Sequence, residues 1–222
     1  MVWFGRDRRH HVSAERWRGT AFGMRFDLRV GERCVDVALP LAGPHFVESF
    51  LGAAAVGHVL GLTPDAMGRA AAGLAPAPHR GEVRRLEGEI TLIDDTYNSS
   101  PEALEASLVT LSLAPARRRV AVLGDMLELG ARGPELHRAA GRALARRVDV
   151  VIGVGPLSKE TLAGAREAGL PEASLVHFDQ AQAAAAADLV RPGDAVLVKA
   201  SRGIRLETVV DAILRRFGGG EA

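Results

Sequence analysis

Three short polar segments carry most of the side chains in this sequence that could bind a ligand. The first, "DDTYN" at 94–98, follows an extended apolar run and precedes a helical pattern that begins near Pro101. A carboxylate of Asp94 or Asp95 can accept hydrogen bonds from paired ribose hydroxyls, and Tyr97, the only tyrosine in the chain, can pack on a base. The alternative is a capped turn with an exposed acid pair. We favour a binding site, because adjacent carboxylates repel each other and gain little on a surface.

The second segment is "GDMLELG" at 124–130, where a glycine would let the backbone approach a ligand. Asp125 could position an amine or a cation there, and an ordinary turn after a strand explains the segment equally well. His137 follows shortly and could act as a base near neutral pH. Because a lone histidine on a helix is more often structural, we assign His137 no catalytic role and name no catalytic residue.

The third segment is "VKASRGIRLE" at 198–207, with Lys199, Ser201 and Arg202 at the start of a helical pattern. Cationic side chains and a hydroxyl beside free helix N–H groups form a site for a carboxylate or a phosphate. A helix cap with two solvated bases is the alternative. Three suitable groups within four residues favour the binding site.

These segments follow strands of a predicted α/β domain with a mostly parallel sheet. Strand, loop and helix patterns alternate five times from Glu82 to Phe217, with strands in "EITLIDD", "RVAVLGD", "VDVVIGVG", "SLVHF" and "DAVLVKAS". The helices are expected to begin at Pro101, Pro134, Pro156, Asp179 and Ile204. The second, third and fifth strands are apolar on both faces and should lie inside the sheet. Ligands bind beyond the carboxyl ends of such strands, where the polar segments lie.

Residues before this domain predict a β-hairpin and two packed helices. "MRFDLRV" from Met24 and "VDVALPL" from Val35 alternate apolar and polar residues around a Gly31-Glu32 turn, and Cys34 is interpreted as a buried strand residue. "FVESFLGAAAVGHVLGL" and "PDAMGRAAAGL" indicate helices, the second with Thr63 as N-cap. The segment "APAPHRG" at 75–81 has no apolar period, which predicts a domain boundary.

Composition argues against several classes of protein. The net charge of +1 gives no broad electrostatic attraction to nucleic acid or to an anionic membrane. A single cysteine excludes an internal disulfide and a cysteine-rich metal site. No apolar run approaches the roughly 20 residues of a membrane span, and the first residues lack the apolar core of a signal peptide. We therefore expect a cytoplasmic protein.

Taken together, "IDDTYNSSPEAL", "VAVLGDMLELG" with the following His137, and "VLVKASRGIRLE" resemble the C-terminal domain of Mur ligases. Upstream, "LPLAGPHFVESFLGAAAVGHVLGL" is similar to the end of their central ATP-binding domain, and "PHRGE" to their interdomain arginine motif. The resemblance runs from about Phe22 to Arg216. It implies that residues 1–78 are the C-terminal remainder of the central domain and that 79–222 are the Rossmann-like C-terminal domain.

The resemblance further implies a part of an ATP-dependent ligase of peptidoglycan synthesis. The motifs are most similar to those of family members that add D-alanyl-D-alanine to UDP-N-acetylmuramoyl-tripeptide through an acyl phosphate, with ATP and Mg²⁺. By this similarity the nucleotide would contact Arg80, Asp95, Tyr97, Asn98 and His45. The dipeptide would contact Lys199, Ser201, Arg202 and Asp125, and no metal ligand is assigned within this chain.

Two features differ from the family pattern. His45 is followed by Phe46, with Ser49 further on, where the family has asparagines that contact adenine. The 222 residues contain no "GxxxxGK[ST]" phosphate loop, so the chain resembles the C-terminal half of a ligase and is expected to be inactive alone. The alternatives are a binding remnant without ligase activity and a folylpolyglutamate-synthetase-like ligase. "DDTYN" and "KASRG" favour the ligase that adds D-alanyl-D-alanine.

Overall fold

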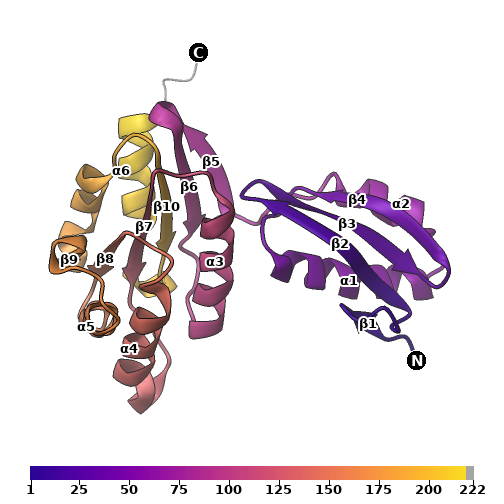
Figure 1. Cartoon of the computed structure of the whole chain (residues 1–222), viewed down its shortest axis with the longest axis horizontal. Coiled ribbons are helices and arrows are strands. Elements are labelled where there is room, and N and C mark those ends of the chain that lie inside the picture. The colour runs from indigo at the N-terminus through magenta and orange to yellow at the C-terminus, as the bar shows by residue number, and fades with distance from the viewer. Residues whose placement is uncertain (219–222) are drawn as a thin grey trace. The chain divides into compact units, whose positions relative to one another are not determined.

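The computed structural model describes residues 1–218 and divides into two compact units. The first unit spans Met1–Pro76, and the second begins at Ala77. Each unit has its own sheet, and Figure 1 shows the elements of both. No helix among residues 1–218 is long and apolar enough to cross a membrane.

The first unit packs two helices on one four-stranded sheet of order β1-β2-β3-β4. Its elements are β1 (Phe4–Gly5), β2 (Val12–Thr20), β3 (Gly23–Val30), β4 (Arg33–Leu39), α1 (Pro44–Val59) and α2 (Pro64–Ala71). The predicted hairpin is confirmed, because Val30 pairs with Arg33 across a two-residue turn in which Gly31 has φ +59°. The predicted cap of α2 is also confirmed, since the hydroxyl of Thr63 accepts the backbone N–H of Ala66 at 3.2 Å.

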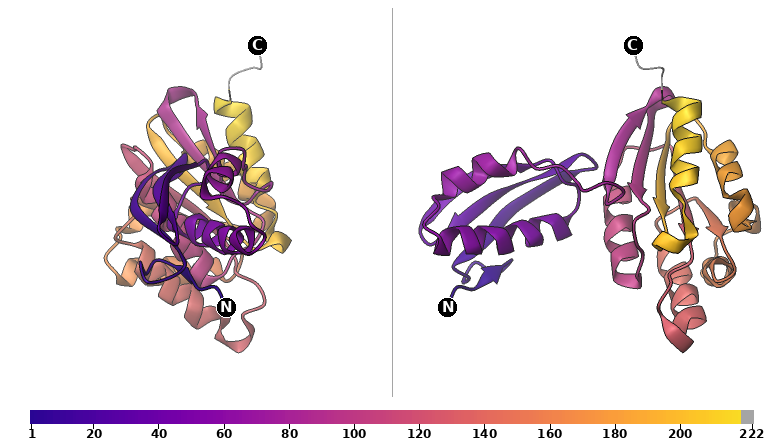
Figure 2. Two further views of the ribbon diagram at one scale, coloured as in Figure 1. Left: turned by 90° about the vertical axis from the view of Figure 1, so that its right-hand side faces the viewer. Right: turned by 180° about the vertical axis from the view of Figure 1, so that it is seen from behind.

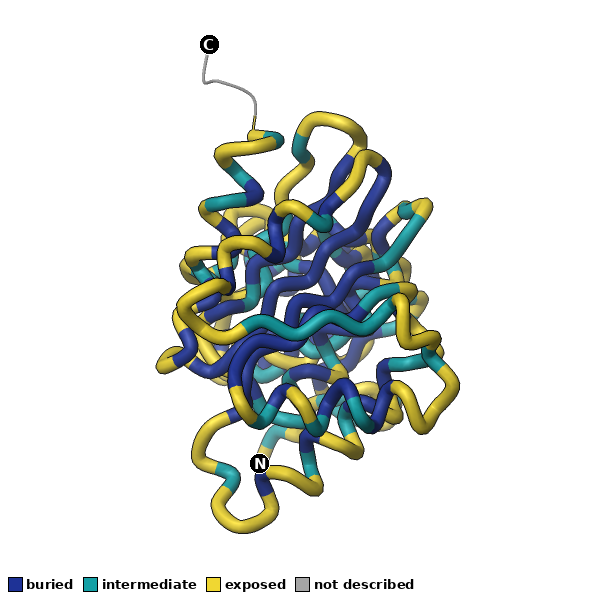
Figure 3. The backbone as a smooth tube through the Cα atoms, turned by 90° about the vertical axis from the view of Figure 1, so that its left-hand side faces the viewer, coloured by how far each residue is buried: buried dark blue, intermediate teal, exposed yellow. Residues whose placement is uncertain are grey.

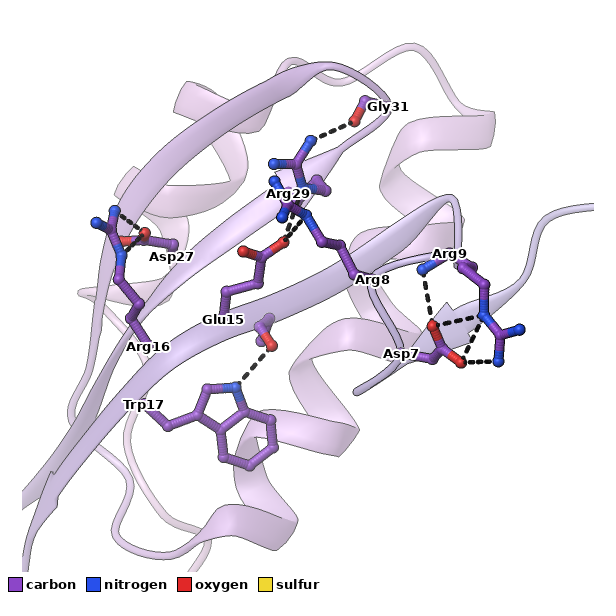
Figure 4. A network of polar contacts seen from close by, with 10 residues as sticks. Asp7, Arg8, Arg9, Glu15, Arg16, Trp17, Asp27, Arg29 and Gly31 are labelled. Carbon is purple, nitrogen blue, oxygen red and sulfur yellow. Dashed lines mark hydrogen bonds and ion pairs between the residues drawn. The ribbon is translucent and has the colours of Figure 1, made fainter.

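The strand β2 and the exposure of Cys34 differ from the sequence interpretation. Phe26 and Val37 pair across the hairpin, and both are buried against the core. Side chains alternate between the two faces of a strand, so Cys34, three residues before Val37, lies on the outer face and is exposed. The prediction that Cys34 is buried was therefore wrong. Figure 4 shows the same outer face, where charged side chains of β2 pair with those of β3, Arg16 with Asp27 and Glu15 with Arg29. These charges hide the strand character of β2 in the sequence.

The second unit is a six-stranded sheet of order β5-β6-β10-β7-β8-β9 with helices on both faces. Every neighbouring pair is parallel except β5 and β6, so the predicted mostly parallel sheet is confirmed. The predicted second, third and fifth strands, now β7, β8 and β10, do lie inside it. The strands are β5 (Glu82–Leu86), β6 (Ile90–Asp95), β7 (Arg118–Gly124), β8 (Val150–Val154), β9 (Leu175–Phe178) and β10 (Asp194–Lys199).

The helices of this unit divide between the two faces of the sheet, as Figure 2 shows. The α-helices are α3 (Pro101–Leu113), α4 (Gly133–Leu144), α5 (Ser158–Glu167) and α6 (Glu207–Phe217). The 3₁₀ segments are η1 (Glu87–Glu89), η2 (Gly130–Arg132), η3 (Glu172–Ser174), η4 (Gln180–Leu189) and η5 (Arg202–Ile204). Side chains of η4 and α6 pack on one face of the strands, and α3, α4 and α5 cover the other. The inner strands of the sheet form a dark blue, buried part of Figure 3, whereas the edge strands β5 and β9 have no buried residue.

Three predicted helices differ from the structure in type, or by more than one residue in where they begin. Helix α5 begins at Ser158 and not at Pro156. The segment after Asp179 forms the 3₁₀ segment η4, and not an α-helix. Its buried residues Ala183 and Ala186 are three positions apart, which is the period of a 3₁₀-helix. The last helix begins at Glu207 and not at Ile204, because η5 and the left-handed Arg205 come first.

Candidate functional site

The polar segments predicted from the sequence meet at one edge of the parallel sheet. Asp95 ends β6 and Lys199 ends β10, and the two residues are register partners in neighbouring parallel strands. The chain leaves β6 toward α3 and leaves β10 toward α6, on opposite faces of the sheet. A crevice between strands whose connections diverge in this way is the usual ligand position in open α/β sheets.

Lys199 and Asp95 form an ion pair at this edge that is largely shielded from solvent. The ammonium lies 2.6 Å from Asp95 Oδ2 and also donates to the carbonyl of Asn98 at 2.9 Å. The side chain of Lys199 is 3% exposed and that of Asp95 is 19% exposed. The hydroxyl of Ser107, on α3, donates to the same Asp95 oxygen at 2.6 Å. Two of the three ammonium donors are therefore used to hold the "DDTYN" segment against β10.

Asp125 and Ser201 are brought together in the loops after β7 and β10. The N–H of Ser201 donates to the carbonyl of Asp125 at 3.1 Å, and the Ser201 hydroxyl accepts the N–H of Leu127 at 2.8 Å. The carboxylate of Asp125 is buried and accepts the N–H of Ser158 at 2.7 Å, at the start of α5. It packs on Gly155, where a Cβ would lie 2.9 Å from Oδ1. These contacts tie three loops together.

His137 is buried, and its ring is fixed by two backbone contacts. Nε2 accepts the N–H of Met126 at 2.8 Å, and Nδ1 donates to the carbonyl of Gly133 at 2.7 Å. A ring that accepts at Nε2 and donates at Nδ1 is the neutral tautomer. The structure thus places His137 beneath the 124–130 loop as a support.

Tyr97 lies close to two arginines at this edge of the sheet. The guanidinium carbon of Arg80 is 3.8 Å from the centre of the tyrosine ring, and that of Arg202 is 5.5 Å from it. Both distances are those of cation–π contacts. Among residues 1–218, neither arginine forms an ion pair with a carboxylate, and Tyr97 remains 39% exposed. The site therefore offers an aromatic ring and two guanidinium groups with donors available to an anion.

His79 holds the backbone just before Arg80 through contacts with Glu82 and Asp94. We call these three residues the His79 cluster. Nδ1 of His79 lies 2.8 Å from Asp94 Oδ2, and the N–H of His79 donates to Glu82 at 3.2 Å. The hydrogen bond to Asp94, aided by the negative charges of Asp94, Glu82 and Glu207 and opposed by burial, raises the pKa of His79 above its ordinary value of 6.5.

The His79 cluster is also a group of described residues whose possible metal-ligand atoms lie within 4.8 Å of one another. The hydrogen bonds of His79 to Asp94 and Glu82 explain why these atoms lie so close together. Asp94 Oδ1 already accepts the backbone N–H of Thr96 at 3.2 Å and its hydroxyl at 2.8 Å. We therefore interpret the cluster as a hydrogen-bonded anchor. The groups around Tyr97 are two guanidiniums, an ammonium and the one carboxylate that this ammonium holds, which is not the set of oxygen ligands that Mg²⁺ prefers.

His45 belongs to the first unit and is described there alone. It is the second residue of α1, after the proline that begins the helix, and its ring lies 4.3 Å from the ring of Phe46. Its carbonyl accepts the hydroxyl of Ser49 at 3.0 Å.

Six of the predicted residues therefore gather at the carboxyl edge of one sheet: Arg80, Asp95, Tyr97, Asn98, Lys199 and Arg202. Asp125 and Ser201 support the neighbouring loops. Sequence reasoning missed His79 and Ser107. Position next to Arg80 was a signal for His79, whereas nothing in the sequence marks Ser107.

A family description, "Mur ligase, glutamate ligase domain", matches residues 79–202. Curated relatives named UDP-N-acetylmuramoyl-tripeptide–D-alanyl-D-alanine ligase include those of Synechocystis, with 35% identity over 81% of this chain, and of Mycobacterium tuberculosis, with 36% identity over 86%. The chain spans 39% and 42% of the length of these two relatives.

Solved structures show the same similarity. A MurF crystal structure from Acinetobacter baumannii aligns with 96% of this chain at 27% identity and a TM-score of 0.85, and the chain covers 47% of it. A MurF ligase from Thermotoga maritima, solved in complex with ADP, aligns with 96% at 26% identity and a TM-score of 0.78, and the chain covers 48% of it. A folylpolyglutamate synthase from Thermotoga maritima, at 18% identity and a TM-score of 0.63, shares the fold.

Proposed function

Because the chain belongs to the Mur ligase family, we propose that it is a part of the ligase that adds D-alanyl-D-alanine to UDP-N-acetylmuramoyl-tripeptide. In this proposal residues 1–78 belong to the central ATP-binding domain and 79–222 form the C-terminal domain. The main support for this proposal is the Tyr97 site, in which one aromatic ring, two arginines and the Asp95–Lys199 ion pair lie at the same edge of the sheet. Peptidoglycan precursor synthesis in the cytoplasm follows from the same proposal.

The nucleotide is proposed to bind over Tyr97 and Arg80. A base can stack on the exposed ring or on the guanidinium plane, both of which tolerate any flat aromatic surface. Asp95 can still accept a ribose hydroxyl, since a carboxylate offers about four lone-pair positions and Oδ2 uses two of them. Asn98 lies beside this carboxylate, with its carbonyl held by Lys199. The assignment of His45 to the nucleotide rests on the family resemblance.

The dipeptide carboxylate is proposed to bind at Arg202. Its guanidinium is exposed, pairs with no carboxylate among the described residues, and can hold a carboxylate through two parallel hydrogen bonds. Lys199 lies within the same segment, but its ammonium already holds Asp95 and Asn98. Lys199, Ser201 and Asp125 therefore shape the loops from which Arg202 projects.

By itself, the chain is proposed to bind substrates without turning over ATP. ATP supplies the phosphoryl group in this family, and stabilising its transfer requires positioned cations around the β- and γ-phosphates. The sequence contains no "GxxxxGK[ST]" loop to provide them. Phosphate release from ATP and Mg²⁺ by the purified chain should stay at the background rate, and turnover that increases with chain concentration would contradict this.

A ligand comparison tests the substrate class. Saturation-transfer NMR on the purified chain should detect D-alanyl-D-alanine and give a weaker signal for L-glutamate, the amino acid added by a folylpolyglutamate-type ligase. Arg202→Met should abolish the dipeptide signal, whereas Arg205→Met, an exposed arginine three residues later, should keep it. A preference for L-glutamate would favour the folylpolyglutamate alternative, and binding of neither ligand would contradict the proposal.

A further inference from the structure

His79 lies next to the proposed nucleotide site without contacting the ring of Tyr97. We propose that His79 is a positioning residue, which holds Arg80 over Tyr97 and so prepares the site for a nucleotide. This inference rests on the proposed function for the identity of the ligand. The position of Arg80 in the free protein can be measured without any ligand.

The ring of His79 is attached to a rigid acceptor. Asp94 is 1% exposed and lies at the end of β6, inside the sheet. One of its oxygens accepts from Thr96, and the other lies 2.8 Å from His79 Nδ1. Because the carboxylate is fixed from two sides, the histidine ring is fixed as well.

The backbone of His79 is held at two further points. Its N–H donates to Glu82 at 3.2 Å, and its carbonyl accepts the N–H of Tyr97 at 3.0 Å. With φ +61°, His79 is in the left-handed region, which is unfavourable for residues with a Cβ and persists only where surrounding contacts impose it. The ring bond to Asp94 is one of these contacts.

This backbone conformation determines where Arg80 points. Arg80 immediately follows His79, and its guanidinium carbon lies 3.8 Å from the centre of the Tyr97 ring. The hydrogen bond from Tyr97 N–H to His79 joins the two residues' segments directly. A free arginine side chain samples many rotamers, so an Arg80 side chain that is already stacked on Tyr97 loses less entropy when it meets a ligand. Loss of the His79 anchor should release the stack.

Three variants of the full chain test the proposal. His79→Ala removes the donor to Asp94, whereas His79→Asn keeps a donor near the position of Nδ1 and tolerates the left-handed conformation. His177→Ala is the matched control, because His177 is half-buried, contacts the carbonyl of Gly155 at 3.0 Å, and lies on β9 at the opposite edge of the sheet.

The readout is the ring of Tyr97. As the only tyrosine, it gives a single set of ring signals after tyrosine-selective isotope labelling. The unchanged chain and the His177→Ala variant should show nuclear Overhauser effects between this ring and the δ protons of Arg80. In His79→Ala these effects should disappear, and in His79→Asn they should remain. For ADP, we expect His79→Ala to raise the Kd about fivefold, the equivalent of one exposed cation–π contact.

Each result decides a separate point. The positioning role would be overturned if His79→Ala kept the Overhauser effects between Arg80 and Tyr97, or if His79→Asn abolished them as completely as His79→Ala does. A weaker ADP affinity with these effects intact would also overturn it, since His79 would then act on the nucleotide itself. If the unchanged chain binds no ADP, the proposed function fails, while the Overhauser effects in the free protein still decide the role of His79.

Discussion

Replacing Lys199 by methionine should destabilise the second unit strongly, because the change leaves a shielded carboxylate without its partner. Methionine keeps most of the length of the side chain and removes its charge. Removing one member of a fully buried ion pair costs about 3–5 kcal/mol. Asp95 is 19% exposed and keeps the hydrogen bond from Ser107, so we reduce the expected loss in unfolding free energy to about 2–3 kcal/mol.

Unfolding in urea, followed through the ring signals of Tyr97, measures this loss in the right unit. Tyr97 lies in the second unit, whereas both tryptophans, Trp3 and Trp17, lie in the first and report its unfolding separately. The midpoint for Lys199→Met should fall without a change in the slope of the denaturant dependence. The tryptophan transition should stay where it is.

Two further variants make the result specific to the shielded pair. The double variant Lys199→Met with Asp95→Asn removes the unpaired charge and should recover part of the loss. Arg117→Met breaks the exposed pair with Glu89, whose side chains are 78% and 79% exposed, and should hardly change the midpoint. If Lys199→Met behaves like Arg117→Met, or if the double variant is less stable than the single one, Lys199 does not hold the site as described.

Three other predictions follow from single contacts. The pKa of His79 is raised in the folded chain, so the stability that protonated His79 adds to the fold is complete below the ordinary value of 6.5 and is lost as the pH rises through the higher folded value. The difference in unfolding free energy between the unchanged chain and His79→Asn should therefore shrink over this pH range. A difference that stays constant with pH would count against this prediction. Gly141→Ala would place a Cβ 2.0 Å from the carbonyl oxygen of Thr161 and should lower the free energy of unfolding by about 3 kcal/mol. Gly133→Ala, whose Cβ would have its nearest neighbouring atom at 3.8 Å, should leave this free energy almost unchanged in the same thermal unfolding experiment. Arg202→Lys should weaken the binding of D-alanyl-D-alanine about tenfold or more and leave the binding of ADP unchanged, because lysine cannot form two parallel hydrogen bonds with the dipeptide carboxylate. Equal losses of affinity for both ligands would assign Arg202 to the nucleotide.

The sequence predicted the second unit well, because its strands carry strong local signals. Runs such as "RVAVLGD" are apolar on both faces, which is typical of strands inside a parallel sheet. The strand β2 has no such signal, since "VSAERWRGT" carries charges that pair across to β3. Its strand character depends on a partner strand, which a local pattern does not contain.

The members of the candidate site were predictable as residue types at strand ends, but their contacts were not. Lys199 was interpreted as a residue facing the substrate, yet its ammonium holds Asp95, 104 residues earlier in the chain. That pairing depends on the register of β10 against β6, which the sequence does not specify. The contacts of Tyr97 with Arg80 and Arg202 likewise depend on two loops meeting at one edge.

Titration of the chain with ADP, followed through the Tyr97 ring signals, tests most directly whether the Tyr97 site binds a nucleotide. We expect a saturable change in the ring signals and a weaker affinity in Arg80→Met. Arg146→Met, which removes an exposed arginine just after α4, should leave the affinity unchanged. No change in the Tyr97 signals at saturating ADP, or the same affinity in Arg80→Met as in the unchanged chain, would contradict a nucleotide site at this edge of the sheet.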